Sequence, residues 1–215
     1  NVDDPYPGVN GGAYISVEDD DENMKRFVME IPNQEFTDNS SHRYSVIAHE
    51  YFHCYQQSLN IHMNKPNADP TSFDTKWQIE GPAAMVEGMY MRQYYGDNYT
   101  AEQQNDVHSD VFTSPTKFES HDTSREIDTN YSSSIFLVLV LAKELQNSGL
   151  TEAKSFQLIL RDYMAAAPNK DTWKTLFNET FNMTLDEFYA KLPNYNGQKN
   201  ADVLPTANLK LEDIF

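Results

Sequence analysis

The motif His-Glu-Tyr-Phe-His at residues 49–53 constrains this chain more than any other feature. Residues four apart on an α-helix lie on the same face, so His49 and His53 can direct their imidazole nitrogens at one metal ion. Glu50 follows the first histidine and can reach a water molecule bound to that metal. This H-E-x-x-H spacing is typical of hydrolytic zinc sites, which take two ligands and a general base from one turn of helix. The motif therefore predicts a Zn²⁺ site on a helix, although two ordinary histidines on an amphipathic helix would give the same pattern.

Length and composition indicate a folded globular domain, with 215 residues of which 39% are hydrophobic and 13% aromatic. The net charge is −17, from 33 acidic and 16 basic residues. A surface this negative repels phosphate groups and anionic lipids, so we expect neither nucleic acid nor an anionic membrane as a partner. No apolar run approaches the roughly 18 residues that a membrane span needs. The sequence gives no indication of the oligomeric state.

The cysteine content and the N-glycosylation sequons give information on the cellular compartment of the protein. Cys54 is the only cysteine, which excludes an intrachain disulfide, and we expect it to be a small buried residue next to His53. The chain does not begin with Met, which we interpret as a sign of processing. Together with its N-x-S/T sequons, this favours a secreted protein or one in an extracytosolic lumen. The sequons lie at Asn39, Asn98, Asn130, Asn178 and Asn182.

The N-terminal region, residues 1–40, is predicted to be an irregular arm followed by β-structure. Residues 13–17 are strand-like, and residues 25–31 alternate well enough for a second strand. The acidic run Glu18–Glu22 between them is expected to be a solvated turn of a hairpin. A calcium loop is the weaker alternative, because the EF-hand spacing and its glycine are absent.

The rest of the chain is predicted to be mostly helical. A helix over residues 42–60 carries the H-E-x-x-H motif, and a second covers residues 76–95 after a loop that contains prolines. Residues 97–130 are polar and weakly periodic; they include His108 and His121, to which the sequence assigns no role. Further helices are expected at 131–147, 151–166, 170–181 and 185–192, followed by a tail over 194–215.

A catalytic zinc usually has three protein ligands and keeps one position for water, so a third ligand is needed. One class of H-E-x-x-H enzymes continues with H-x-x-G-x-x-H from the second histidine. Here Gln56 and Leu59 stand at the glycine and last histidine positions, which excludes that class. Another class takes a glutamate from a following helix. The second predicted helix offers two, Glu80 and Glu87, which lie two turns apart and therefore on one face.

The block W-x-x-E-G-x-A-x-x-x-E that begins at Trp77, following H-E-x-x-H, resembles the gluzincin metallopeptidases and above all the aminopeptidase N-like enzymes. The resemblance covers roughly residues 42–145. It implies that Glu80 is the third zinc ligand. It also implies that Glu87 lies behind the ligands, where a carboxylate can accept the second N–H of a ligand histidine.

Two further segments are similar to motifs of the same family. The segment that opens at Tyr131 resembles Y-x-K-G-x-x-x-L, whose tyrosine donates a hydrogen bond to the oxyanion, although Ser133 and Ser134 replace the lysine and glycine. A phenol suits that role because it stabilises negative charge without being charged itself; an ordinary core tyrosine is the alternative. Glu30 is faintly similar to the glutamate of G-x-M-E-N that holds a substrate amine, but the glycine is missing, so an exopeptidase is not supported.

These observations predict an α+β fold, with a small N-terminal β lobe (1–40) packed on a mostly helical, gluzincin-like catalytic region (41–215) in one compact domain. The expected function is that of a zinc metallopeptidase acting on peptides or proteins, with Glu50 as general base and Tyr131 as oxyanion donor. The alternative is a catalytically silent scaffold that binds a partner and holds a structural zinc. The presence of Glu50 favours the enzyme, because a silent site has little need of a base. The predicted zinc ligands are His49, His53 and Glu80.

Overall fold

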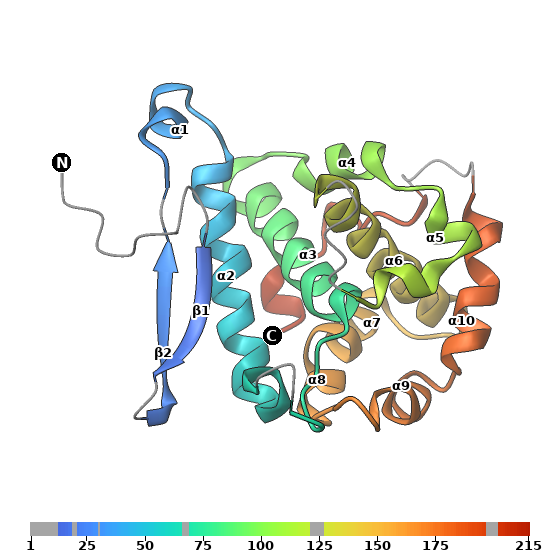
Figure 1. The fold of residues 1–215 in the computed structure, drawn as a ribbon. Helices are drawn as coiled ribbons and strands as arrows, with labels where there is room; N and C mark the ends of the chain where they lie inside the picture. Colours follow the sequence, from blue (N-terminus) through green and yellow to red (C-terminus); the bar gives the residue numbers. More distant parts are fainter. Residues whose placement is uncertain (1–12, 19–20, 30, 66–68, 121–126, 197–201) are drawn as a thin grey trace.

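The computed structural model of the chain describes residues 13–18, 21–29, 31–65, 69–120, 127–196 and 202–215. Within these residues the chain forms a helical body with a two-stranded hairpin along one side (Figure 1). The strands are β1 (Ala13–Glu18) and β2 (Asp21–Met29). The helices are α1 (Asn33–Thr37), α2 (His42–Leu59), α3 (Lys76–Tyr95), α4 (Tyr99–Gln103), α5 (Asp110–Thr113), α6 (Ile127–Asn147), α7 (Glu152–Gln157), α8 (Tyr163–Ala165), α9 (Trp173–Phe181) and α10 (Leu185–Lys191).

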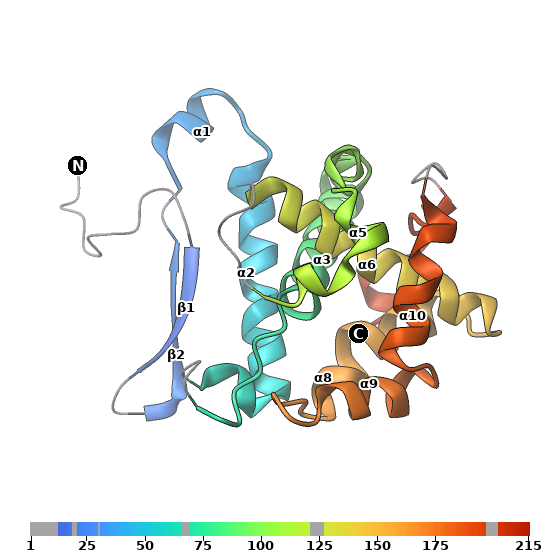
Figure 2. The ribbon, with the colours of Figure 1, turned by 45° about the vertical axis from the view of Figure 1, so that its right-hand side comes forward.

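Helix α3 is the centre of the body, with α2 on one side and α6 on another (Figures 1 and 2). Most of α3 is buried, including Trp77, Met85 and Met89, while its C-terminal end is exposed at Tyr94 and Tyr95. A helix that is apolar or small on every face is a buried helix, and the run Pro-Ala-Ala-Met-Val from residue 82 has that composition. Because α3 touches both neighbours, it can carry polar side chains to α2 and still anchor the core through α6.

Gly81 sets the distance between α3 and α6. A Cβ atom at this position would lie 2.5 Å from the backbone oxygen of Ser134 on α6, and 2.8 Å from a methyl group of Val138. Only glycine allows the two backbones to approach this closely. The contact places Tyr131, three residues before Ser134, beside the same stretch of α3.

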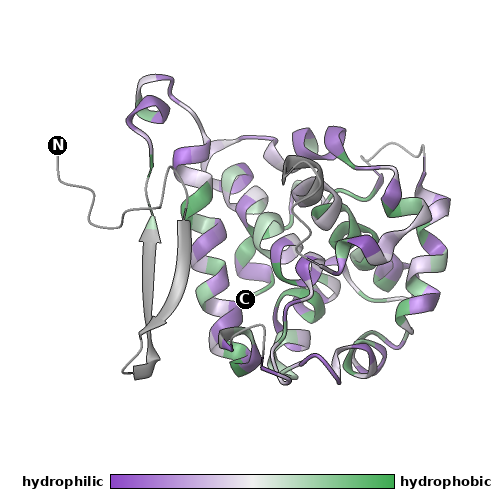
Figure 3. Ribbon diagram, in the orientation of Figure 1, coloured by the Kyte–Doolittle hydropathy of each residue, from purple (hydrophilic) through white to green (hydrophobic). Residues whose placement is uncertain are grey.

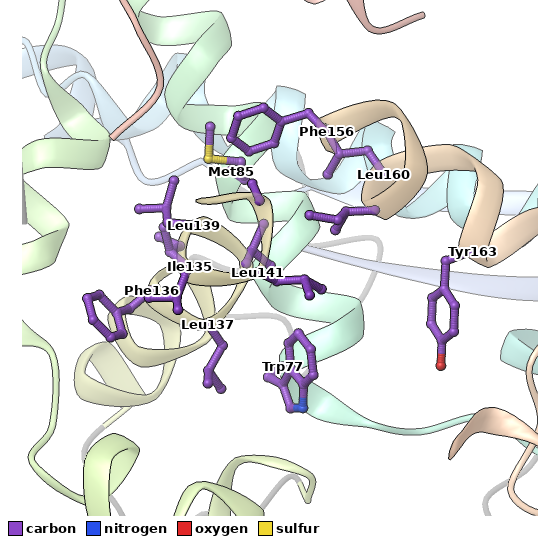
Figure 4. Packing of buried hydrophobic residues seen from close by; sticks show 14 of the residues in the cluster. Trp77, Met85, Ile135, Phe136, Leu137, Leu139, Leu141, Phe156, Leu160 and Tyr163 are labelled. Carbon is purple, nitrogen blue, oxygen red and sulfur yellow. The ribbon is translucent and has the colours of Figure 1, made fainter. Parts of the chain in front are cut away.

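The hydrophobic core lies between α3, α6 and the C-terminal helices (Figure 4). The middle of α6 is buried without interruption from Ser132 to Ala142. Phe156 on α7 and Leu160, in the π-helical segment Leu158–Asp162 that joins α7 to α8, pack in the same cluster. Hydrophilic and hydrophobic segments alternate along the outer helices, as expected for helices with one face in the core (Figure 3).

The prediction of an α+β fold with a β lobe is wrong. In the part of the chain that the structure describes, the strands form one two-stranded antiparallel hairpin, β1–β2, next to α2, and the body itself is all-helical. The alternation in the sequence located both strands, but it carries no information on how many strands a sheet contains. A two-stranded ribbon is too small to form a lobe with its own core. Residues 33–37 of the predicted β region are a helix, α1.

Several element bounds also differ from those predicted. Strand β2 begins at Asp21, so the acidic run contributes Glu18 to β1 and Asp21 and Glu22 to β2, and its central residues lie outside the described part. The weakly periodic segment after α3 contains the short helices α4 and α5. None of the described helices is long and apolar enough to cross a membrane.

Candidate metal centre

Three predicted ligands from two helices converge on one point. His49 and His53 lie on α2, on the side facing α3, and Glu80 lies on α3. The Nε2 atoms of the two histidines are 3.1 Å apart. The Oε2 atom of Glu80 lies 3.2 Å from Nε2 of His49 and 3.5 Å from Nε2 of His53. These three side chains form a group that could hold a metal ion, and no other such group occurs among the described residues.

The spacing of the three ligand atoms fits a tetrahedral metal. Nitrogen and oxygen ligands at tetrahedral corners, about 2.0–2.1 Å from zinc, lie about 3.3–3.4 Å from one another. The three observed separations, 3.1, 3.2 and 3.5 Å, bracket that value. A fourth corner, opposite this triangle, is where such a metal keeps water in a catalytic site.

The other ring nitrogens of both histidines face acceptors. Nδ1 of His49 lies 2.9 Å from Oε2 of Glu87, and Nδ1 of His53 lies 2.8 Å from Oε1 of Gln56. Each Nδ1 therefore carries a proton and donates it, so Nε2 is the ring nitrogen of each histidine that is left to bind a metal ion or a second proton. Two ring nitrogens and a carboxylate oxygen at such short range repel one another unless a proton or a metal ion lies between them, so the donor set fits a metal.

The short distances between these side chains also shift the pKa values of His49, Glu80 and Glu87. Burial alone disfavours the charged form of His49, but its hydrogen bonds to Glu80 and Glu87 outweigh burial and raise its pKa to about 10. Burial would raise the pKa of Glu80, yet hydrogen bonds from the two histidines hold that pKa well below its ordinary value. The pKa of Glu87 is lowered in the same way, chiefly by its hydrogen bond with His49. The site thus presents ionised carboxylates that attract a cation.

Glu50 and Tyr131 lie in the same electrostatic environment. Burial raises the pKa of Glu50, and charge on His53 and His49 opposes that effect. The ring of Tyr131 lies 5.9 Å from the ring of His49, centroid to centroid. Burial raises the pKa of Tyr131 above its usual range, and the charges of Glu80 and Glu50 raise it further, so its hydroxyl stays protonated and can donate.

Lys76, at the start of α3, is a neighbour of Tyr131 that the sequence did not single out. The side chain is buried, and its Nζ atom lies 5.1 Å from the centre of the Tyr131 ring. A cation over an aromatic face is attracted by the ring, which helps to hold the phenol in place. Lys76 precedes Glu80 by one helical turn, so a positive charge lies on the α3 face that carries the third ligand.

Other residues considered in the sequence lie elsewhere. His108 bonds through its backbone N–H to Ser133 Oγ and approaches Asp110, and it is not part of the metal-binding group. Cys54 is half-buried on α2, not fully buried as expected. Glu30 and His121 lie outside the described residues.

Gln56 is a residue of the centre that the sequence does not predict. In the sequence it only excludes the H-x-x-G-x-x-H ligand pattern. Its sole sequence signal is its position three residues after His53, on the same helix face.

Comparison with known proteins adds no relative: no protein-family model matches the sequence, and no curated protein or solved structure matches it significantly. Membership of the gluzincins therefore stays a prediction that rests on the motifs quoted above.

Proposed function

We propose that this chain is a zinc-dependent metallopeptidase that hydrolyses peptide bonds. The observation that carries the proposal is the convergence of two histidine nitrogens and a glutamate oxygen with tetrahedral spacing, next to a carboxylate that directly follows the first ligand. His49, His53 and Glu80 would hold the metal. Bound zinc would supply a water of lowered pKa and a Lewis acid for the carbonyl oxygen.

Glu50 is the general base in this proposal. It neighbours His49 on α2 and interacts electrostatically with both histidines, yet it is not one of the three converging ligands. A carboxylate in that position accepts a proton from the attacking water and then delivers it to the leaving amine. Partial burial favours this cycle, because it raises the pKa of Glu50 above its ordinary value and so makes the carboxylate a stronger base.

Tyr131 is the oxyanion donor. Its hydroxyl remains protonated in this acidic surrounding, and its ring packs near His49. A neutral donor of this kind stabilises the negative charge that develops on the carbonyl oxygen without adding a charge to the ground state.

The test compares wild type, Glu50→Gln and Tyr131→Phe on one peptide library at matched zinc occupancy. Glu50→Gln retains the shape of the side chain and removes the base, so zinc binding should persist while kcat falls by roughly 10²-fold or more. Tyr131→Phe should lower kcat by about 10²–10³-fold, the usual cost of one oxyanion donor. Wild-type protein that binds zinc but cleaves nothing in the library would reject the peptidase and leave the alternative, a silent scaffold with a structural zinc.

A further inference from the structure

Gln56 is a fully buried polar residue that connects the two ligand helices. Its side chain is 0% exposed. The amide oxygen lies 2.8 Å from Nδ1 of His53 on the same helix. The amide nitrogen donates to the backbone oxygen of Ile79 on α3, at 3.0 Å. Both ends of one side chain are therefore engaged, one with a metal ligand and one with the partner helix.

The contact with Ile79 determines which way the Gln56 amide points. A backbone carbonyl can only accept, so the NH₂ group must face Ile79 and the oxygen must face His53. An amide oxygen in turn can only accept, so Nδ1 of His53 carries the proton. The Nε2 atom of His53, which lies 3.5 Å from Oε2 of Glu80, is then the ring nitrogen available to bind a metal. A carbonyl on α3 thus selects the tautomer of a histidine on α2.

The same bond ties α2 to the turn of α3 that holds the third ligand, because Ile79 directly precedes Glu80. The other histidine is held differently: His49 donates to the carboxylate of Glu87. One ligand histidine therefore has a charged acceptor and the other a neutral one, and neither acceptor is among the three converging ligands.

We propose that Gln56 is a positioning residue of the metal centre, which holds His53 in its metal-binding tautomer and fixes the Glu80 turn of α3 against α2. This inference rests on the metal centre of the proposed function but not on peptidase activity. Partners that orient ligand histidines typically change metal affinity by about 10–100-fold when they are removed.

The experiment measures Zn²⁺ affinity by competition with a chromophoric chelator, without any peptide. Gln56→Met has a similar volume but no acceptor, and we expect it to bind Zn²⁺ about 10–100-fold more weakly. Gln56→Glu retains an oxygen opposite His53 but loses the N–H that donates to Ile79, so it should recover only part of the affinity. Co²⁺ in place of Zn²⁺ reports the ligand set through its visible absorption, which we expect to change in Gln56→Met and to persist in Gln56→Glu.

The matched control is Gln78→Met, the same substitution at another buried glutamine of the α2–α3 region. Gln78 is 3% exposed and accepts a hydrogen bond from Tyr163. We expect this variant to lose stability and to bind Zn²⁺ like wild type. The inference is overturned if Gln56→Met binds Zn²⁺ as tightly as wild type, if Gln78→Met loses as much affinity, or if wild type binds no Zn²⁺. Wild type that binds Zn²⁺ but cleaves no peptide contradicts the proposed function alone.

Discussion

Glu80 and Glu87 lie on one face of α3 but contact different nitrogens of the ligand histidines, and the geometry of the imidazole ring gives them different roles. The carboxylate of Glu80 approaches the Nε2 atoms of both histidines, whereas that of Glu87 approaches Nδ1 of His49. The two nitrogens of one imidazole point away from each other. A carboxylate on the Nδ1 side therefore cannot share a metal with Nε2, so Glu80 is placed to bind and Glu87 is placed to orient.

This difference predicts unequal losses of metal affinity. Glu80→Ala removes a ligand and should abolish tight Zn²⁺ binding. Glu87→Gln leaves all three ligands in place and should weaken Zn²⁺ by about 10–100-fold. Titration with Zn²⁺ against a competing chelator measures both. Glu179→Gln, at an exposed position on α9, controls for the change in net charge. If Glu87→Gln proved the more damaging change, the two assignments would be reversed.

Among single residues, the pair His49/His53 was predicted from spacing, because residues four apart share one helix face. The roles of Glu80 and Glu87 were predicted from the resemblance to the gluzincins, with which their position on one face of α3 agrees. Gln56 could not be predicted, because its importance depends on where the Ile79 carbonyl lies after α2 and α3 pack.

Among the elements, the packing of α3 on α6 brings Tyr131 to the centre, and Gly81 allows it. Glu80 and Gly81, which are adjacent in the α3 block, are therefore required for two separate physical reasons. The glutamate faces α2 and the metal centre, while the glycine faces the Ser134 carbonyl of α6. One turn of α3 positions both the third ligand and, through α6, the phenol.

Gly81→Ala tests this dependence. The added methyl group has no room beside the Ser134 carbonyl, so α6 must shift, and we expect a loss of about 1–3 kcal/mol in the free energy of unfolding. Because the shift moves Tyr131, kcat should fall as well, at unchanged zinc occupancy. Urea unfolding and peptide turnover measure the two effects.

Gly88→Ala is the matched control for this change on the same helix. Its methyl group would meet the Thr100 side chain of α4, away from α6. It should lower stability without a comparable effect on kcat. Equal losses of kcat in the two variants would show that α6 packing does not position Tyr131.

The helices were easier to predict than the sheet. Helix α3 has the predicted bounds 76–95, because Gly96 ends it in the left-handed conformation that glycine adopts easily. Helix α6 begins at residue 127, not at 131 as predicted. The prediction missed the first turn, Ile-Asp-Thr-Asn, because three of its four residues are polar and do not continue the apolar period. The β lobe failed for another reason: alternation predicts strands, while the number of strands that pair depends on distant contacts.

The C-terminal part of α6 is held by a charged side chain in addition to apolar packing through Leu141 and Leu145. Glu144 accepts hydrogen bonds from Lys191 on α10 and from Tyr195 just after it. Burial would raise the pKa of Glu144, but these hydrogen bonds outweigh burial and lower that pKa below its ordinary value. A carboxylate with a lowered folded-state pKa stabilises the fold above its unfolded pKa, and that contribution is lost as the pH falls through the folded value.

Glu144→Gln should therefore destabilise the protein at neutral pH and lose its effect in acid. We expect a loss of about 1–3 kcal/mol at pH 7, the range for hydrogen bonds to a charged group. The difference from wild type should shrink as the pH falls below the ordinary carboxyl pKa of about 4. Urea unfolding at a series of pH values measures it, with Glu102→Gln on the surface of α4 as the control. A difference that stayed constant with pH would mean that the charge of Glu144 contributes nothing.

For the whole molecule, the net charge and the sequons give information on the environment of the protein more than on its fold. A net charge of −17 favours solubility and opposes binding to other polyanions. The four sequon asparagines whose side chains are described are all exposed, as acceptors of glycans must be: Asn39, Asn98, Asn178 and Asn182. A secretory location stays a prediction that this exposure supports.

The metal centre joins two helices, α2 and α3, that are separated in the sequence by residues 60–75. Because α2 and α3 each supply ligands, a bound ion links them in the folded state, and no such site exists in the unfolded chain. Metal binding should therefore add directly to stability. At free zinc about 1,000-fold above its dissociation constant, the added free energy of unfolding is about 4 kcal/mol.

Removal of the metal should consequently lower the melting temperature by roughly 8–16 °C, at 2–4 °C per kcal/mol for a domain of this size. Calorimetry of the zinc-loaded protein with and without a chelator measures the shift. His53→Ala lacks a ligand, so its melting temperature should be the same in both conditions and close to that of chelated wild type. Glu50→Gln retains all three ligands and should show the full wild-type shift. A zinc-dependent shift in His53→Ala equal to that of wild type would place the ion elsewhere on the molecule and remove the basis for the proposed centre.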